Sequence, residues 1–540
     1  MASTYAPDTR QNLVDYAVMA LCLLGVFIAF EIRDFAYFRD YAIAFEGSYR
    51  LFLGQVPYRD FGAPVGPASF VIPALFFKLF EPNWTVFLLS QQFQNACLLV
   101  LVYALLGRIG TRALIRRIAL LSFSVFYLLL LTHPWYNSTG ALLLVAGALC
   151  ALGSSRISVV AAGLLAGLAV LAKQDFGLLT LLIAGFFVAV VSLGSDRDKI
   201  LPGLDCMRDR ARLLALAINL LLFAFSAVAV IALFIQATDA EQFKYWFNYG
   251  QKPHEARSIS LRDLFGNSFG TLGWVTSLIA LARNNFRLLV ASIFITAASV
   301  SRTTSGLGFT HYYFVAFLPV IVDECLQLKI RFKALVVLVE LYTSARVMIR
   351  PVSDVYHVFE SVALHQPEHF FFDYRKLSRP MAGFPAELQA FSPHMQAPQQ
   401  TIDTILELKR IAAEKRAAAP GAELKVLNLT ELTPIYTELS AAPPKGLPLW
   451  FHTKVSIFPR QIDQLNETLA GQAFDIILLQ GTHEGLTAPY RNFLSILNAN
   501  RSYALLREIQ DSPANATWPC EPDCQGEIFV YVKRSAFTPR

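Results

Sequence analysis

The sequence predicts a polytopic α-helical membrane protein with a soluble α/β domain at its C-terminal end. Of the 540 residues, 55% are apolar and only 16% are charged, whereas soluble domains carry about 25% charged residues. The apolar residues gather into about eleven runs of a length suited to crossing a bilayer. After about residue 350 the composition changes, and buried-strand patterns appear beside a helical one.

All eleven predicted spans fall within the first 350 residues. The first lacks a small-residue cleavage site, so we expect it to stay in place as a signal anchor. The run 67–80 is too short to span and is expected to form an interfacial or re-entrant helix. The spans are predicted near residues 13–32, 85–106, 115–131, 139–152, 157–172, 176–193, 213–235, 269–282, 288–300, 312–326 and 334–348.

Basic residues predict the orientation. If the N-terminus is cytoplasmic, every cytoplasmic loop is short and rich in arginine or lysine, as the positive-inside rule requires. This clustering in loops also argues against nucleic-acid binding, despite a net charge of +6. The same orientation puts everything after the eleventh span outside the cytoplasm. It also puts outside the loops 33–84, 133–139, 173–175, 238–267 and 302–311.

Residues 351–540 are predicted to form the α/β domain. The segments 423–429, 474–480 and 527–533 have the pattern of buried strands, and 401–419 has helical periodicity. No glycine motif for nucleotide binding opens a helix there. Cys520 and Cys524 are close enough in sequence to close a small disulfide loop, a pairing that the sequence leaves open; a zinc site would need two further ligands.

The segment 34–67 is the main candidate for function. Acids, arginines and aromatic residues interleave there beside a predicted span, a costly arrangement unless it serves a purpose. Transfer to a hydroxyl group needs a base near the acceptor oxygen, and Asp40, with its pKa raised by burial, suits that role. The alternative is an interfacial aspartate paired with Arg33 or Arg39.

Residues 40–61, DYAIAFEGSYRLFLGQVPYRDF, resemble the first outer loop of bacterial GT-C glycosyltransferases, the family of protein mannosyltransferase-like and lipid A aminoarabinose transferase-like enzymes. Asp40 stands fourteen residues before Gly54, which leads into Pro-Tyr-Arg-Asp at 57–60. GLLAGLAVLAKQDFGLL and FTHYYFVAFLP resemble two later elements of the family in the same order. Tyr41 replaces the glutamate of many relatives, and GAPVGP replaces an Asp-x-Lys-Pro-Pro-like element, so Asp34 and Asp60 remain competitors for the role of base.

Other candidate residues follow from charge at the outer ends of spans. Lys173 suits a lipid-linked phosphate, although a snorkelling lysine is the alternative. Gln174 and Asp175 are candidates for the sugar site. His311 and Tyr312, with Arg302 nearby, are placed to stabilise a departing phosphate, although a structural histidine is the alternative. Arg59, Asp60 and Arg257 complete the substrate-binding candidates.

The resemblance implies a GT-C fold and an enzyme that moves a sugar from a polyprenyl-phosphate donor to an acceptor hydroxyl, with inversion and with Asp40 as base. The acceptor would be a cell-envelope glycan, lipid or protein, and the location the bacterial inner membrane with the C-terminal domain in the periplasm. No cofactor is expected and no metal cluster stands out, although a divalent metal stays open. The rival readings are a transporter or flippase of a lipid-linked or anionic substrate, which repeated halves would favour, and an inactive GT-C-like scaffold.

Overall fold

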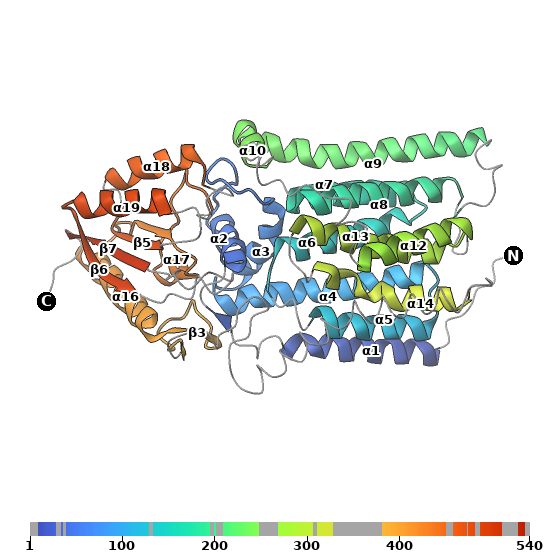
Figure 1. Cartoon of the computed structure of the whole chain (residues 1–540), viewed down its shortest axis with the longest axis horizontal. Coiled ribbons are helices and arrows are strands. Elements are labelled where there is room, and N and C mark those ends of the chain that lie inside the picture. Colours follow the sequence, from blue (N-terminus) through green and yellow to red (C-terminus); the bar gives the residue numbers. More distant parts are fainter. Residues whose placement is uncertain are drawn as a thin grey trace.

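The structure is a computed structural model that joins a helix bundle to a mixed sheet covered by helices (Figure 1). The sheet lies beyond one end of the bundle, and the N-terminus lies at the other end. The structure describes residues 9–28, 34–35, 39–128, 133–194, 199–200, 209–247, 268–305, 310–327, 381–449, 457–471, 474–480, 487–509 and 528–534.

Each of the first ten predicted spans coincides with a helix of the bundle, and the eleventh lies outside the described residues. In the described part, α4, α8 and α9 are long and apolar enough to cross a membrane, and the apolar stretches described in the other helices are shorter. The number of spans therefore stays a prediction. The bundle helices are α1 (Thr9–Ile28), α4 (Trp84–Arg108), α5 (Ala113–Phe123), α6 (Tyr136–Ala151), α7 (Arg156–Ala172), α8 (Gln174–Ser192), α9 (Arg210–Ala237), α12 (Ser268–Ala282), α13 (Phe286–Ser305) and α14 (Leu318–Gln327).

Two predicted spans are less regular than expected. The third continues from α5 into a π-helical turn, η3 (Ser124–Leu128). The tenth begins as a 3-10 helix, η5 (Thr310–Phe317), and becomes α-helical only at Leu318. Pro319 explains the second change, because proline suits the first turn of a new helix and cannot donate to the turn before it.

Small residues let α7 approach α9 closely. A Cβ atom on Gly163 would lie 2.3 Å from the carbonyl oxygen of Phe223, and one on Gly167 would lie 2.6 Å from that of Ala227. Spacing of four residues between small side chains is typical of helix contacts in membranes. The other side of α9 is exposed and apolar, as at Leu221 and Phe225, which suits contact with lipid.

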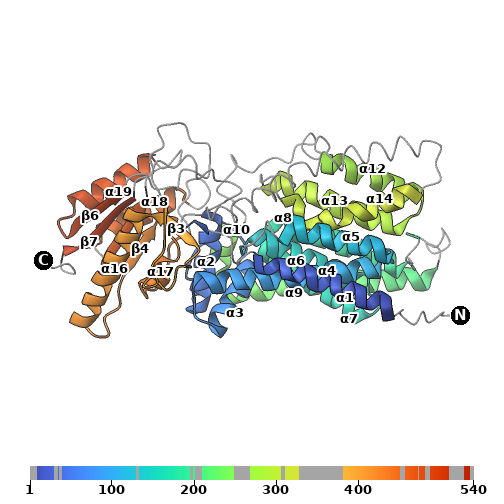
Figure 2. The same cartoon turned by 90° about the horizontal axis from the view of Figure 1, so that it is seen from below.

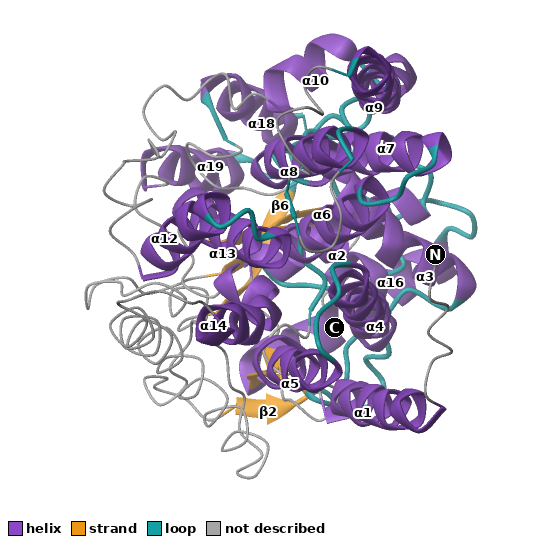
Figure 3. Ribbon diagram, turned by 90° about the vertical axis from the view of Figure 1, so that its right-hand side faces the viewer, coloured by secondary structure: helices purple, strands orange, loops and turns teal. Residues whose placement is uncertain are grey.

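The end of the bundle that faces away from the C-terminal sheet (Figures 2 and 3) is called the basic end, because arginines of the predicted cytoplasmic loops make their contacts there. Arg117 Nε donates to Asp15 Oδ1 at 2.6 Å, and Arg116 also contacts Asp15. Arg287 contacts Glu324. Arg108 and Arg212 donate to backbone carbonyls, of Leu152 and Leu193 respectively. These loops lie at one end, as the orientation argument requires.

The opposite end, which we call the capped end, carries the segment 34–80 and the C-terminal region. Helix α2 (Arg39–Phe52) ends at Gly54, whose φ of +80° permits the sharp exit. The predicted interfacial helix is present as η2 (Pro67–Phe70) and α3 (Val71–Leu79). Helix α10 (Ala240–Phe247) lies at the end of α9 that is nearer to the C-terminal sheet.

The C-terminal strands predicted from the sequence are present. The sheet has the order β4-β5-β7-β6, with β4 and β5 parallel and the other pairs antiparallel. Its strands are β4 (Val426–Leu429), β5 (Ile476–Gln480), β6 (Tyr503–Ile509) and β7 (Ile528–Lys533), and its helices are α16 (Gln399–Ala418), α17 (Ile435–Glu438), α18 (Pro459–Ala470) and α19 (Thr487–Ala499).

Alternation along the strands gives the sheet two different faces. Leu427 and Ile477 point into a core with α18 and α19. Val426 and Ile476, one residue earlier, point into a core with α16. That second core also holds the face of α2 made by Tyr41, Phe45 and Tyr49, so α2 packs with the C-terminal region as one unit.

A small second sheet ties the two parts together. Strand β1 (Asp34–Phe35) pairs in parallel with β3 (Met395–Pro398), which pairs with β2 (Met381–Gly383). Asp34 lies opposite Met395, although more than 350 residues separate them. The capped end is thus built from both halves of the chain.

Candidate functional site

Helix α2 places Asp40 at the capped end. Asp40 is the second residue of the helix, and its side chain lies outside the described part. The next residue, Tyr41, stacks its ring on that of His133, with the centroids 4.0 Å apart and the planes 8° apart. Phe45, one turn later, stacks on Trp84. The helix is therefore fixed against the bundle beside the loop that precedes α6.

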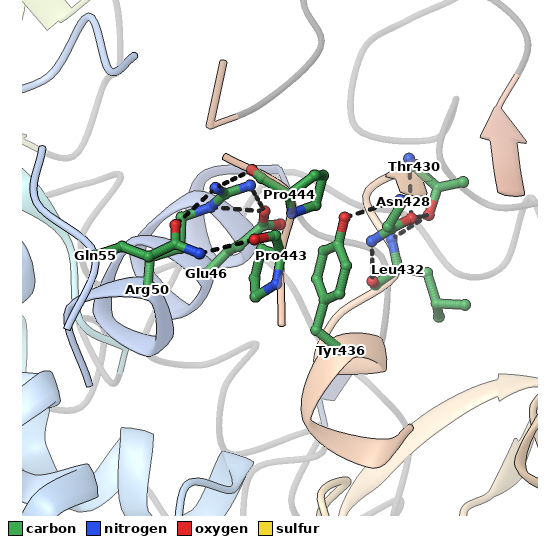
Figure 4. A network of polar contacts seen from close by, with 9 residues as sticks. All are labelled: Glu46, Arg50, Gln55, Asn428, Thr430, Leu432, Tyr436, Pro443 and Pro444. Atoms are coloured by element: carbon green, nitrogen blue, oxygen red, sulfur yellow. Dashed lines mark hydrogen bonds and ion pairs between the residues drawn. The ribbon is translucent and has the colours of Figure 1, made fainter. Parts of the chain in front are cut away.

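The far end of α2 is held by the C-terminal region (Figure 4). Arg50 Nη1 donates to the carbonyl oxygen of Pro444 at 2.9 Å, and Gln55 Nε2 donates to that of Pro443 at 2.7 Å. Arg50 also pairs with Glu46 at 2.9 Å, and its side chain is almost wholly buried. Burial raises the pKa of Glu46, and the charge and hydrogen bonds of Arg50 only partly oppose that rise.

Tyr436 extends this network toward the sheet. Its hydroxyl accepts a hydrogen bond from the backbone N–H of Asn428 at 2.9 Å. Burial raises the pKa of Tyr436, the charge of Glu46 raises it further, and Arg50 and the Asn428 N–H lower it. The phenol therefore stays neutral and acts as a structural link between β4 and the segment beside α2.

Arg59 and Asp60 lie in the turn after α2 and pair with each other at 3.0 Å. Asp60 also accepts from the Val56 N–H at 2.8 Å and pairs with Lys445 at 3.4 Å. Burial alone would raise the pKa of Asp60, but the Val56 N–H, Arg59 and Lys445 outweigh it and lower the pKa below 3.8. A carboxylate with a lowered pKa is a weak base.

The turn itself fits tightly between its neighbours. Tyr58 is buried with a φ of 63°, and its N–H donates to Phe61 O at 2.8 Å. Gly62 exchanges backbone hydrogen bonds with Leu447 and Leu449. A Cβ atom on Gly66 would lie 1.9 Å from the carbonyl oxygen of Leu171. Only glycine allows the turn to touch the end of α7 there.

Lys173 and Gln174 form the junction between α7 and α8. Lys173 Nζ lies 3.0 Å from Asp175 Oδ2, and both side chains are close to nine-tenths buried. The ammonium also lies over the rings of Tyr136 and Phe176, at 5.5 and 5.7 Å. Gln174 Nε2 donates to the carbonyl oxygens of Pro64 and Phe247, at 3.3 and 2.8 Å. Gln174 thus joins the turn after α2 to α10.

Arg302, His311 and Tyr312 belong to α13 and η5, and their side chains, like that of Asp34, lie outside the described part. Arg257, Cys520 and Cys524 lie outside it altogether. The neighbouring Tyr313 is fully buried, and its hydroxyl lies 3.4 Å from Ser138 Oγ. This contact brings η5 to the first turn of α6, next to Tyr136 and hence Lys173.

One group of residues did not enter the sequence-based candidates. Helix α4 carries Gln91, Gln92, Gln94 and Asn95, all buried. They hydrogen-bond to one another, and Gln94 Oε1 accepts from Thr139 Oγ1 at 2.9 Å. The signal was available, because four amide side chains within five residues of an apolar span are unusual.

In the described residues, no group of three or more His, Cys, Asp or Glu side chains is arranged to hold a metal ion. A pocket of about 320 Å³ lies between α5, η5 and α14. Its lining is apolar apart from Ser122 and Asp323 and consists of Ile115, Ile118, Ser122, Val315, Leu318, Pro319, Val322, Asp323 and Leu326.

No protein-family model matches the chain, and no curated protein matches it in sequence. Solved structures do match. The structure of ArnT from Cupriavidus metallidurans in the apo state has a TM-score of 0.52 and 13% identity, over 98% of this chain and 100% of that one. The chain has the GT-C fold. This confirms, for the fold, the resemblance that the motifs indicated.

Two further solved structures match nearly the whole chain at similarly low sequence identity. ArnT from Cupriavidus metallidurans bound to undecaprenyl phosphate has a TM-score of 0.50 and 13% identity, over 97% of this chain and 99% of that one. The archaeal oligosaccharyltransferase AglB from Archaeoglobus fulgidus, in complex with an inhibitory peptide and a dolichol-phosphate, has a TM-score of 0.42 and 11% identity, over 97% of this chain and 77% of that one. At 13% identity, the likeness to the two ArnT structures shows a shared fold and no more.

Proposed function

We propose that this protein is a membrane glycosyltransferase that moves a sugar from a polyprenyl-phosphate donor to a hydroxyl group outside the cytoplasm, with inversion. The observation that carries the proposal is the match to ArnT over almost the full length of both chains. ArnT was solved with undecaprenyl phosphate bound, so the fold accommodates a lipid phosphate of the proposed kind.

Asp40 is the proposed base, which would take the proton of the acceptor hydroxyl as the new bond forms. The contacts of its rival Asp60 favour this choice, because Asp60 is engaged by three partners and has a lowered pKa. Asp40 begins a helix that both the bundle and the C-terminal region hold in place. A fixed base is worth more than a mobile one, since orientation is part of the catalytic gain.

The departing phosphate would be stabilised by Lys173, Arg302 and His311, with Arg59 at the rim. The described contacts around Ser138 and Tyr136 bring the backbone of η5 and the α7–α8 junction to the same end of the bundle. Tyr312 would assist His311 at the phosphate, and Gln174 and Asp175 would line the sugar side. A polyprenyl phosphate is a good leaving group, so a clamp of positive charge suffices in principle without a metal ion.

The proposed topology puts the N-terminus in the cytoplasm and the capped end in the periplasm of a bacterium, with the protein in the inner membrane. Residues 1–350 would form the catalytic membrane domain, and 351–540 a periplasmic domain that covers the site and contacts the acceptor. The acceptor would be a glycan, lipid or protein of the cell envelope.

The test is a transfer assay with purified protein in liposomes, using radiolabelled undecaprenyl-phosphate sugars and a crude envelope fraction as acceptor, with and without EDTA. Wild type should transfer label, and Asp40→Asn should lose at least about a hundredfold in rate. A variant that folds and transfers at the wild-type rate would move the base elsewhere. Donor flipping across the same liposomes, without transfer, would establish the transporter instead.

A further inference from the structure

A neutral polar cluster is buried inside the bundle at the capped end. Its members come from α4, from the first turn of α6 and from η5. Gln91 Nε2 donates to Asn95 Oδ1 at 2.7 Å, and Thr139 Oγ1 donates to Gln94 Oε1 at 2.9 Å. Hydroxyl and amide groups alone make these contacts, so the cluster offers donors and acceptors without net charge.

Asn137 stands out within this cluster. It is fully buried, and neither its Oδ1 nor its Nδ2 has a hydrogen-bond partner among the described residues. Its neighbours in sequence, Ser138 and Thr139, are both engaged. A buried amide without partners loses its hydrogen bonds to water and forms none with the protein in exchange, and such groups are rare in native structures. An unmet donor and an unmet acceptor at one position call for a ligand or a bound water molecule.

The position of Asn137 links it to the proposed site. Tyr136, just before it, has its ring under the Lys173 ammonium at 5.5 Å. His133, four residues earlier in the loop before α6, stacks on Tyr41, the neighbour of the proposed base. Asn137 is thus adjacent in sequence to a residue that contacts Lys173 and four residues from one that contacts α2, the helix of the proposed base.

We propose that Asn137, with Gln94 and Thr139, forms a subsite for an uncharged sugar, one that presents hydroxyl or acetamido groups. The inference rests on the proposed function and names the class of its donor. An amide side chain matches a sugar hydroxyl because it donates and accepts at adjacent atoms. A cationic amino sugar would need a free carboxylate in the cluster and an anionic uronic acid a free basic group, since an unpaired buried charge is costly. The described contacts of the cluster involve neither, and nearby Asp175 is paired with Lys173.

The test compares binding and transfer of four undecaprenyl-phosphate donors in lipid nanodiscs: a neutral hexose, an N-acetylhexosamine, a 4-amino-4-deoxy sugar and a uronic acid. Undecaprenyl phosphate alone is the reference. Binding is measured by the rise in unfolding temperature with ligand concentration. The wild type should bind the two neutral donors at least about tenfold more tightly than either charged donor or the reference.

Asn137→Leu removes both amide groups that lack hydrogen-bond partners and replaces the side chain with one of similar volume. We expect it to fold normally, to bind the neutral donors about tenfold to a hundredfold more weakly, and to bind undecaprenyl phosphate unchanged. Asn137→Ser is a smaller second variant, should the leucine disturb packing. The matched control is Asn219→Leu in α9, whose amide donates to Ser192 Oγ at 2.9 Å away from this cluster; it should leave all four affinities unchanged.

The outcomes separate this inference from the proposed function. Preference for a charged sugar, equal binding of all donors or no donor binding at all would overturn the subsite. If both Asn137 variants bind the neutral donors as tightly as the wild type does, the subsite would also be overturned. Asn137 would then bind a water molecule only. Neutral-sugar binding that depends on Asn137, without transfer in the wild type, would uphold the subsite and refute the transferase. If the wild type transfers only a charged sugar, the transferase would be upheld and the neutral-sugar subsite refuted.

Discussion

Both ends of the helix bundle bury ion pairs, such as Arg50–Glu46 and Lys173–Asp175 at the capped end, but among the described residues the capped end also buries a neutral polar cluster. At the basic end, carboxylates meet guanidinium groups directly: Asp15 with Arg116 and Arg117, and Asp323 with Arg112. At the capped end, the cluster around Gln94 is neutral, and Asn137 has no partner among the described residues. Groups that satisfy one another are structural, whereas an unsatisfied buried group is a candidate for binding something else.

The difference teaches where to look for chemistry in this fold. Charge by itself is a poor guide, because the basic end holds many charged side chains that are already paired. The capped end combines a helix fixed at both ends with an amide cluster that is incompletely satisfied. If this comparison is right, variants at the basic end should change stability, and variants in the capped-end cluster should change ligand binding.

The largest stability effect is expected at Asp15. Its side chain is almost wholly buried and accepts from Arg117 Nε at 2.6 Å and from Tyr103 Oη at 2.9 Å. Asp15→Asn removes the countercharge of two arginines and should cost about 3–5 kcal/mol, seen as a marked fall in unfolding temperature. The double variant with Arg117→Gln should recover part of the loss. If Asp15→Asn alone is as stable as the wild type, the claim that paired charges at the basic end stabilise the fold would be wrong.

A smaller effect, based on shape rather than charge, is expected at Gly66. In Gly66→Ala the new methyl group meets the Leu171 carbonyl oxygen at 1.9 Å, a backbone atom that cannot rotate away. The variant should lose about 1–3 kcal/mol of stability and should also slow transfer, because Leu171 lies two residues before Lys173.

Gly54→Ala is the control for Gly66→Ala. Gly54 has a φ of +80° and nothing within 4 Å of a Cβ atom. Its substitution should cost about 1 kcal/mol through backbone strain and should leave the transfer rate per folded molecule unchanged. Equal effects of the two variants on transfer would mean that the contact between the turn and α7 does not position Lys173.

The smallest effect on stability is expected at Asp60, the aspartate in the turn after α2 at the capped end. Its ionic partners Arg59 and Lys445 are more than half exposed, so the pairs are weak. Asp60→Asn should cost about 1 kcal/mol near neutral pH. A lowered pKa means that the stabilisation is present above pH 3.8 and fades as the pH falls through the lowered value.

Unfolding temperatures measured across the pH range check this. The wild type and Asp60→Asn should differ above about pH 4 and converge below it. Lys445→Met should have less effect than Asp60→Asn, because the Val56 hydrogen bond to Asp60 remains. A loss of stability in Asp60→Asn as large as that in Asp15→Asn would show that the exposed pairs of Asp60 stabilise the fold as much as the buried pairs of Asp15, which would contradict this ranking.

Much of the fold was predictable because its signals are local. Ten predicted spans coincide with helices, and hydrophobic runs predicted β4, β5 and β7. The 3-10 start of η5 and the π-helical turn after α5 depend on packing against neighbours and leave no periodic pattern. The pairing of Asp34 with Met395 joins segments more than 350 residues apart, which no single-sequence pattern reports.

The candidate site was predictable only in part. Motif spacing pointed to α2 and to Lys173, and the structure places both at the capped end. The motifs did not indicate that the Gln174 amide would donate hydrogen bonds to the carbonyl oxygens of Pro64 and Phe247. They also did not indicate that the Asp60 carboxylate would accept a hydrogen bond from the Val56 N–H. Asn137 escaped notice because a single asparagine after an aromatic pair carries no signal until its surroundings are known.

The most direct test of the account pairs Asp40→Asn with Asp15→Asn in the same liposomes and measures transfer rate per folded molecule together with unfolding temperature. The account predicts that Asp40→Asn keeps the wild-type unfolding temperature and loses at least about a hundredfold in rate, whereas Asp15→Asn loses stability and keeps its rate. An Asp40→Asn variant that folds and transfers like the wild type would contradict it.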